Sequence, residues 1–235
     1  MTPDTAMFFA AGHGTRMREL TRDRPKPMIP LGGVPLIDRA LDWADGAGIQ
    51  NRVVNVHYLG EMLADHLKNR PGLQISEEPA QALETGGGLK QALPLLGRDP
   101  VYTLNPDAVW TGANPFTQLA AYWRPEDMDA LLLLVPVTSA LGHSSGGDFT
   151  MSDRGNLRRA VKTDPLAYVY TGAQIIATGG LGSIRQDVFS LNLLWDRMMA
   201  NDRLFGCVYP GDWISVGTPE SLALAEAHLR RISDV

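Results

Sequence analysis

The 235-residue sequence is poor in cysteine, in net positive charge and in long apolar runs. Its single cysteine, Cys207, excludes a disulfide within the chain, and the apolar neighbours of this residue predict an unreactive thiol buried on a strand. The net charge of -5 provides no basic face that could release counterions from nucleic acid. No segment approaches the ~20 apolar residues of a membrane span. We therefore expect a cytoplasmic protein that binds neither nucleic acids nor membranes.

No interior linker rich in proline, glycine and serine divides the sequence, so we expect one α/β domain over residues 1–235. Short apolar runs alternate with helical patterns, which is typical of a Rossmann-like, mainly parallel sheet with helices on both faces. Strands are predicted at 6–10, 52–56, 73–76, 101–105 and 130–136, and helices at 35–47, 59–68, 87–95, 115–123 and 219–232. Shorter strands at 149–151, 157–161 and 168–176 predict a small antiparallel extension over the mouth of the sheet.

A glycine turn follows the first predicted strand, in the stretch 10–16 that reads Ala-Ala-Gly-His-Gly-Thr-Arg. The bare backbone NH groups of such a turn can approach phosphate oxygens, and Arg16 and Lys26 place positive charge beside it. A P-loop requires Gly-Lys-Ser/Thr, whereas Thr15 and Arg16 follow Gly14, and the dinucleotide fingerprint requires a third glycine where Met17 stands. The turn therefore predicts a nucleoside triphosphate site of another kind.

The turn and the segment 24–30, which reads Arg-Pro-Lys-Pro-Met-Ile-Pro, together resemble the signature of the sugar-nucleotide pyrophosphorylases, a nucleotidyltransferase family. That signature is a Gly-x-Gly-Thr-Arg turn followed by Pro-Lys-Pro. The resemblance implies a GT-A-like nucleotidyltransferase fold. It also implies the reaction, in which a sugar 1-phosphate oxygen attacks the α-phosphorus of a nucleoside triphosphate and pyrophosphate leaves. Positioning and charge neutralisation carry such transfers.

The resemblance also implies roles for individual residues. Gly12, Gly14 and Thr15 would wrap the triphosphate beside Ala10 and Ala11. Arg16 would bind the departing pyrophosphate, and Lys26 would bridge the α-phosphate and the sugar phosphate. The prolines on either side of Lys26 fix the direction of the chain, so little entropy remains to be lost when the lysine binds.

A Mg²⁺ site is implied where an apolar strand ends in Asn105-Pro106-Asp107, because the family usually has Asn-Gly-Asp there and its aspartate binds the metal. Asp107 is therefore the expected metal ligand, although Pro106 departs from the pattern. A second family aspartate is replaced by Ser215, which leaves Asp107 and the substrates as the expected ligands of the ion. The other possibility, that Asp212 reaches the ion, requires a residue three positions away on a strand to face the same side.

The segment 83–88, which reads Leu-Glu-Thr-Gly-Gly-Gly, resembles that of the short uridylyltransferases that act on N-acetylmuramic acid 1-phosphate in peptidoglycan recycling. Its glycines would let the backbone lie against a flat base, so Glu84, Thr85 and Gly86 are expected to bind the nucleotide. The resemblance favours UTP as the nucleotide. Sugar-side segments of the same group are matched at five positions, which are Asn105, Gly147, Asp148, Lys162 and Thr171.

Several alternatives remain open at this stage. The chain could be a mannose-1-phosphate guanylyltransferase, a nucleotidyltransferase with another phosphate acceptor, or a non-catalytic nucleotide-sugar regulator for which Ser215 would be the first symptom. The nucleotide-binding part is expected at about 1–135, the sugar-binding part at about 136–218 and a C-terminal helix at 219–232. The sequence contains no hexapeptide repeat, so no β-helix acetyltransferase domain is expected. A monomer or a small homo-oligomer is expected.

Overall fold

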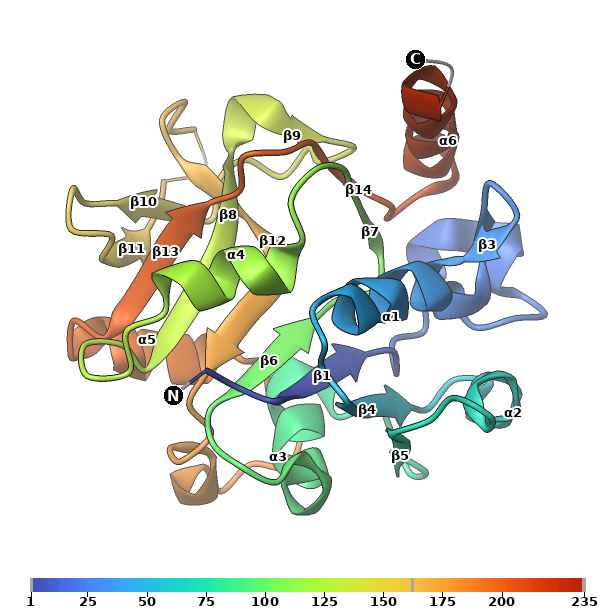
Figure 1. Ribbon diagram of the computed structural model, residues 1–235, viewed down its shortest axis with the longest axis horizontal. Helices are drawn as coiled ribbons and strands as arrows, with labels where there is room; N and C mark the ends of the chain where they lie inside the picture. The colour runs from blue at the N-terminus through green and yellow to red at the C-terminus, as the bar shows by residue number, and fades with distance from the viewer. Residues whose placement is uncertain (1, 162, 234–235) are drawn as a thin grey trace.

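The computed structural model describes residues 2–161 and 163–233 (Figure 1). Its main sheet runs in the order β11-β10-β12-β6-β1-β4-β5, and β8 pairs with β12 and carries β13. The strands are β1 (Thr5–Phe9), β4 (Asn51–Val56), β5 (Leu73–Glu77), β6 (Val101–Leu104), β8 (Ala130–Pro136), β10 (Phe149–Met151), β11 (Leu157–Arg159), β12 (Tyr168–Ile176) and β13 (Leu204–Val208). β6, β1, β4 and β5 are mutually parallel, whereas β12 and β10 pair antiparallel with their neighbours.

Helices cover both faces of this sheet, as the alternating apolar pattern predicted. α1 (Leu36–Gly46), α2 (Gly60–Leu67) and α4 (Pro115–Tyr122) pack on one face, and α3 (Glu84–Leu96) and α5 (Asn192–Ala200) on the other. Strand β1 shows why both faces must be covered. Phe8 is buried against α1 and α4, and its neighbour Met7 is buried against α3. Successive side chains of a strand point to opposite faces, so a strand that is apolar throughout needs a layer on each side.

A third apolar cluster supports the segment that follows β1. Two 3-10 helices, η1 (Thr15–Thr21) and η2 (Lys26–Met28), and the hairpin of β2 (Pro30–Leu31) and β3 (Val34–Pro35) lie beside α6 (Pro219–Ser233), which stands at one end of the molecule (Figure 1). Buried Met17 and Ile29 pack there against Ile214 and Val216. A small sheet of β7 (Ala108–Trp110), β14 (Trp213–Ser215) and β9 (Ala140–Leu141) completes this region.

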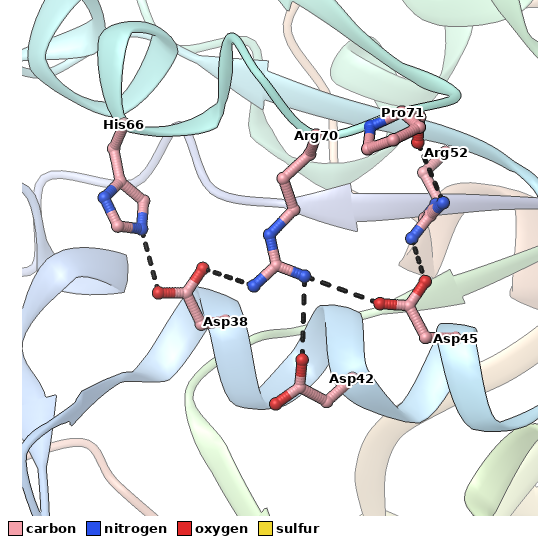
Figure 2. A network of polar contacts seen from close by, with 7 residues as sticks. All are labelled: Asp38, Asp42, Asp45, Arg52, His66, Arg70 and Pro71. Carbon is pink, nitrogen blue, oxygen red and sulfur yellow. Dashed lines mark hydrogen bonds and ion pairs between the residues drawn. The ribbon is translucent and has the colours of Figure 1, made fainter.

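Charged side chains tie α1 to the residues that follow α2 (Figure 2). The Arg70 guanidinium lies 2.9 to 3.6 Å from three carboxylates spaced along α1. These carboxylates belong to Asp38, Asp42 and Asp45. His66 on α2 contacts the first of them at 2.9 Å, and Arg52 at the start of β4 contacts the last. The network adds polar contacts to the apolar face of α1, which packs on the parallel strands through Ile37 and Leu41.

The strands and helices predicted in the first two thirds of the chain are confirmed, with shifts of a few residues at their ends. Three features differ from the prediction. The antiparallel strands β10, β11 and β12 continue the main sheet through the pairing of β12 with β6, so they are not a separate layer. The predicted glycine turn leads directly into the 3-10 helix η1, whose N-cap is Gly14. Helix α3 begins at Glu84, three residues before the predicted start.

None of the helices in the described part of the chain combines the length and the apolar composition that a membrane span requires.

Cys207 lies on β13, as its apolar neighbours predicted, and burial raises the pKa of its thiol to about 12. Because the thiolate is the reactive form, we predict that the folded protein does not react with Ellman's reagent at about pH 8. The thiol is expected to react once guanidinium chloride unfolds the chain. Absorbance at the wavelength of the released dye checks this, and rapid reaction without denaturant would contradict the burial of Cys207.

Candidate active site

A cavity of about 370 Å³ lies at the carboxyl ends of the parallel strands β1, β4 and β6 and reaches the start of α3. Open α/β sheets place their ligands at this edge. Eleven of the residues singled out from the sequence line it, namely Ala10, Ala11, Gly12, Gly14, Thr15, Arg16, Lys26, Glu84, Thr85, Asn105 and Asp107. The fold thus brings together three segments that lie far apart in the sequence.

The two glycines of the turn after β1 have different environments. Gly14 has a φ of +64°, and a Cβ there would lie 2.8 Å from Cβ of Lys26, closer than atoms can pack. Its carbonyl accepts a hydrogen bond from the NH of Met17 at 2.8 Å. A Cβ at Gly12 would meet no atom of the described chain within 4 Å. Gly14 is therefore required by the fold, whereas the space beside Gly12 is left to whatever enters the cavity.

Lys26 and Asp107 form an ion pair in the cavity wall. Lys26 Nζ donates to Asp107 Oδ2 at 2.6 Å, and the two side chains are 12% and 35% exposed. Pro25, in an extended conformation, precedes η2, and Pro27 lies within it, so the backbone of Lys26 has little freedom. Asp107 is held from the other side because its carbonyl accepts a hydrogen bond from Val216. The pair joins the end of β6 to the loop after β1 across 81 residues of sequence.

The second cation of the cavity, Arg16, lies against the chain between β14 and α6. A Cβ at Gly217 would be 3.5 Å from the guanidinium carbon of Arg16, which is an ordinary contact distance. Gly217 itself lines the cavity. The guanidinium therefore lies beside Gly217, close to the N-terminus of α6, and its binding of pyrophosphate stays a prediction.

The positions of the acidic residues show which of them could hold a metal ion in the cavity. Among the described residues no cluster of three or more His, Cys, Asp or Glu side chains could hold a metal ion. Asp212 is turned away, because its carboxylate contacts Nε2 of the buried His228 at 3.0 Å. Ser215 pairs with Ala108 in the small sheet. Asp107 therefore remains the one carboxylate from the sequence-predicted metal segments that lines the cavity.

The residues expected on the sugar side lie elsewhere or are engaged within the fold. Gly147 packs against Ala167, Asp148 Oδ2 accepts the NH of Tyr170 at 2.9 Å, and Thr171 Oγ1 donates to the Leu133 carbonyl at 2.6 Å. None of these three expected residues lines the cavity, whereas Asn105 does. Lys162 falls outside the described residues. The structure thus brings only Asn105 of this set to the cavity, and sugar binding by the others stays a prediction.

The three glycines of the segment 83–88 all lie inside α3, whereas the predicted helix 87–95 included only the last two. A Cβ at Gly86 would lie 2.4 Å from the ring of Phe189, and one at Gly87 would lie 2.0 Å from the Asp187 carbonyl oxygen. The Gly86 NH donates to the Phe189 carbonyl at 2.9 Å. These glycines let the segment 187–189 approach the helix, a packing reason that the sequence interpretation missed. Gly86 does not line the cavity, and its contact with a nucleotide stays a prediction.

Two polar residues of the cavity were missed by the sequence analysis. Asn55 on β4 and Glu78 just after β5 are 3% and 2% exposed, and both line the cavity. Signals for both exist in the sequence. Asn55 interrupts the valine-rich strand 53–56, and Glu78 follows a predicted strand at the edge where ligands bind.

Comparisons with known proteins identify the family. A model of the MobA-like NTP transferase domain matches residues 6–144. The chain belongs to this family. It is 41% identical to the N-acetylmuramate alpha-1-phosphate uridylyltransferase of Caulobacter vibrioides over 97% of each chain. It is 33% identical to the enzyme of the same name from Neisseria meningitidis serogroup B, over 94% of this chain and 96% of the relative. The predicted class of enzyme, a nucleotidyltransferase, is confirmed.

Solved structures confirm the predicted fold. A putative glucose-1-phosphate thymidylyltransferase from Bacillus anthracis matches with a TM-score of 0.79 and 16% identity, covering 96% of this chain and 95% of that one. Such a likeness, at low identity, is a likeness of architecture. The chain has the GT-A-like fold of sugar nucleotidyltransferases.

Substitution of the two glycines of the turn is predicted to affect stability to different extents. Gly14→Ala is expected to lower the free energy of unfolding by about 1–3 kcal/mol, because the new methyl group meets Lys26 and the backbone is left-handed. Gly12→Ala is expected to change it by less than about 0.5 kcal/mol. Urea unfolding of the two variants beside the parent protein checks both values, and similar losses at both positions would contradict this account of the turn.

Proposed function

We propose that the protein transfers the uridylyl group of UTP to N-acetylmuramic acid 1-phosphate and releases pyrophosphate, a step of cell-wall sugar recycling. The names of the two relatives at 41% and 33% identity support the substrates. The observation that carries the proposal is the ion pair of Lys26 and Asp107 inside the cavity, beside the glycine turn and Arg16. These groups are those that a transfer between two polyanions requires.

The triphosphate is proposed to lie along the turn after β1. Open space beside Gly12 lets phosphate oxygens approach the backbone NH groups of the turn, and Thr15 lies at the start of η1. Arg16, at the rim near Gly217, would bind the pyrophosphate as it leaves. Ala10, Ala11, Glu84 and Thr85 would then hold the nucleoside, with the base on the α3 side of the cavity.

Lys26 is proposed to hold the reacting groups together. Its ammonium would pair with a nonbridging oxygen of the α-phosphate and with the sugar phosphate, so that the attacking oxygen faces the α-phosphorus. The ion pair with Asp107 can open when phosphate binds. Lys26 and Asp107 are 12% and 35% exposed, so breaking the pair is costly unless another anion replaces the carboxylate. A phosphate oxygen is such an anion and accepts a charge-assisted hydrogen bond from the ammonium. Phosphate oxygens can therefore replace the carboxylate on Lys26.

Mg²⁺ fits the charges of the cavity, and Asp107 is the residue proposed to hold it. Two cations, Lys26 and Arg16, line the cavity together with three carboxylates, those of Glu78, Glu84 and Asp107. These side chains alone cannot balance a triphosphate and a sugar phosphate, so a divalent cation would supply the missing charge. Mg²⁺ commonly takes one or two protein carboxylates and completes its shell with phosphate and water, so a single aspartate suffices.

The substrates are tested by pyrophosphate release. The purified protein is incubated with Mg²⁺, each of the four common nucleoside triphosphates, and N-acetylmuramic acid 1-phosphate, mannose 1-phosphate or glucose 1-phosphate. Release that is fastest with UTP and N-acetylmuramic acid 1-phosphate is the expected result, and it should stop when EDTA removes the metal. Preference for GTP and mannose 1-phosphate would contradict the proposed substrates. Nucleotide binding without release in any combination would contradict catalysis.

Lys26→Ala separates catalysis from binding. Because Lys26 is proposed to act on the reacting phosphates, kcat should fall by about 10²–10³-fold, while the Kd for UTP with Mg²⁺ changes by less than about tenfold. Calorimetry and a pyrophosphate assay measure the two quantities. The matched control is Lys68→Ala, which removes a lysine that is exposed on the surface. Comparable losses of kcat and affinity in Lys26→Ala would argue against the bridging role.

A further inference from the structure

Two buried side chains connect two segments of the cavity wall through three hydrogen bonds. The NH of Ala10 donates to Asn55 Oδ1 at 2.7 Å, and Asn55 Nδ2 donates to Glu78 Oε1 at 2.6 Å. The second carboxylate oxygen, Glu78 Oε2, accepts the NH of Leu83 at 2.8 Å. The chain of bonds runs from the end of β1, across β4 and the end of β5, to the residue before α3.

We call this chain of three hydrogen bonds, from Ala10 through Asn55 and Glu78 to Leu83, the relay. Its two ends lie in the segments proposed to hold the nucleoside. Ala10 leads into the glycine turn, and Leu83 precedes Glu84 and Thr85, which line the cavity. Glu84 has a φ of +60°, a left-handed conformation that is costly for a residue with a side chain. Such a conformation persists where its surroundings hold it. The bond from Leu83 to Glu78 holds the residue immediately before it.

If Asn55 and Glu78 only filled space in the core, apolar side chains could replace them. Glu78 is 2% exposed, and none of the salt bridges found among the described residues includes its carboxylate. Burying a carboxylate costs free energy that apolar side chains of the same size would not cost. Asn55 and Glu78 nevertheless also line the cavity. The free-energy cost of burying Glu78 is explained if the distance between the Ala10 and Leu83 main chains determines what the cavity binds.

We infer that Asn55 and Glu78 are positioning residues that hold the Ala10 and Leu83 main chains at the spacing the nucleoside requires. The inference rests on the proposed function, because it assumes that this cavity binds a nucleoside triphosphate. In this role neither residue touches the reacting phosphates. Loss of the relay should therefore weaken nucleotide binding and leave the binding of the sugar phosphate unchanged.

The polarity of the relay provides the test. Glu78→Gln replaces one acceptor oxygen by a donor that faces the NH of Leu83 or the amide of Asn55, and Asn55→Asp brings two carboxylates together. In the double variant Asn55→Asp/Glu78→Gln every bond can form again. The carboxylate introduced at position 55 would accept from Ala10 and from the new amide at position 78, whose oxygen would accept from Leu83. The amide and the carboxylate have exchanged places, and the total charge is that of the parent protein.

Each single variant is expected to raise the KM and the Kd for UTP at least about tenfold, the effect of losing one hydrogen bond to a charged group. The double variant is expected to return both to within about threefold of the parent value, because its hydrogen bonds are restored. The KM for the sugar phosphate should stay constant in all three. A double variant that binds UTP as weakly as the worse single variant, although it is folded, would overturn the inference.

A matched control separates positioning from stability. Gln174 forms a comparable buried chain in the same sheet, accepting from Trp195 Nε1 at 2.9 Å and donating to Thr103 Oγ1 at 3.0 Å, and it does not line the cavity. Gln174→Leu is expected to lower the Tm and to leave the KM for UTP unchanged. An equal rise in the KM for UTP in this control would assign the effect to stability and overturn the positioning role.

Hydrogen exchange tests the relay without substrate, so that its failure is distinct from failure of the proposed function. In Asn55→Asp the carboxylate can still accept from Ala10, but it repels Glu78, so the exchange of the Leu83 amide should accelerate although neither partner of the bond from Leu83 to Glu78 is changed. Unchanged exchange at Leu83 would overturn the relay. If the parent protein neither binds nor uses a nucleotide, the proposed function is wrong whatever the exchange shows.

Discussion

The ion pair between Lys26 and Asp107 is the constraint on which the site depends. Gly14 makes room for the lysine, two prolines restrict its backbone, and Val216 holds the aspartate. Each partner neutralises the other inside the cavity, so neither charge is left unpaired in a partly buried place. Breaking the pair leaves no charge unpaired if a phosphate takes the place of the carboxylate. The pair can therefore keep both groups oriented before substrates bind and still give way to phosphate oxygens.

The sheet explains how residues 81 positions apart meet. β1 and β6 are parallel neighbours in which Phe8 lies opposite Leu104, so the segments that follow them leave the sheet side by side. One segment is the glycine turn, and the other carries Asn105 and Asp107. Met17 of η1 and Ile29, which directly follows η2, pack in the third apolar cluster and so hold both 3-10 helices in place. The proposed phosphate site thus depends on apolar packing by residues that do not line the cavity.

Much of the site follows from the sequence because its signals are local. A strand ending in a glycine turn, a lysine between prolines and an aspartate after a strand can each be recognised within about ten residues. Asn55 and Glu78 could not be assigned in this way, because the bonds from Asn55 to Ala10 and to Glu78 span 45 and 23 residues. The packing role of the α3 glycines was missed for a related reason. Their neighbours, Asp187 and Phe189, lie about a hundred positions further along the chain.

The central claim is that Lys26 exchanges Asp107 for phosphate when substrates bind. A crystal structure with Mg²⁺ and a UTP analogue whose α,β-bridge cannot be cleaved tests it most directly. The account predicts that Nζ of Lys26 lies within hydrogen-bond distance of an α-phosphate oxygen and that its 2.6 Å contact with Asp107 is broken. An intact ion pair beside a fully bound nucleotide, with the lysine away from the α-phosphate, would contradict it.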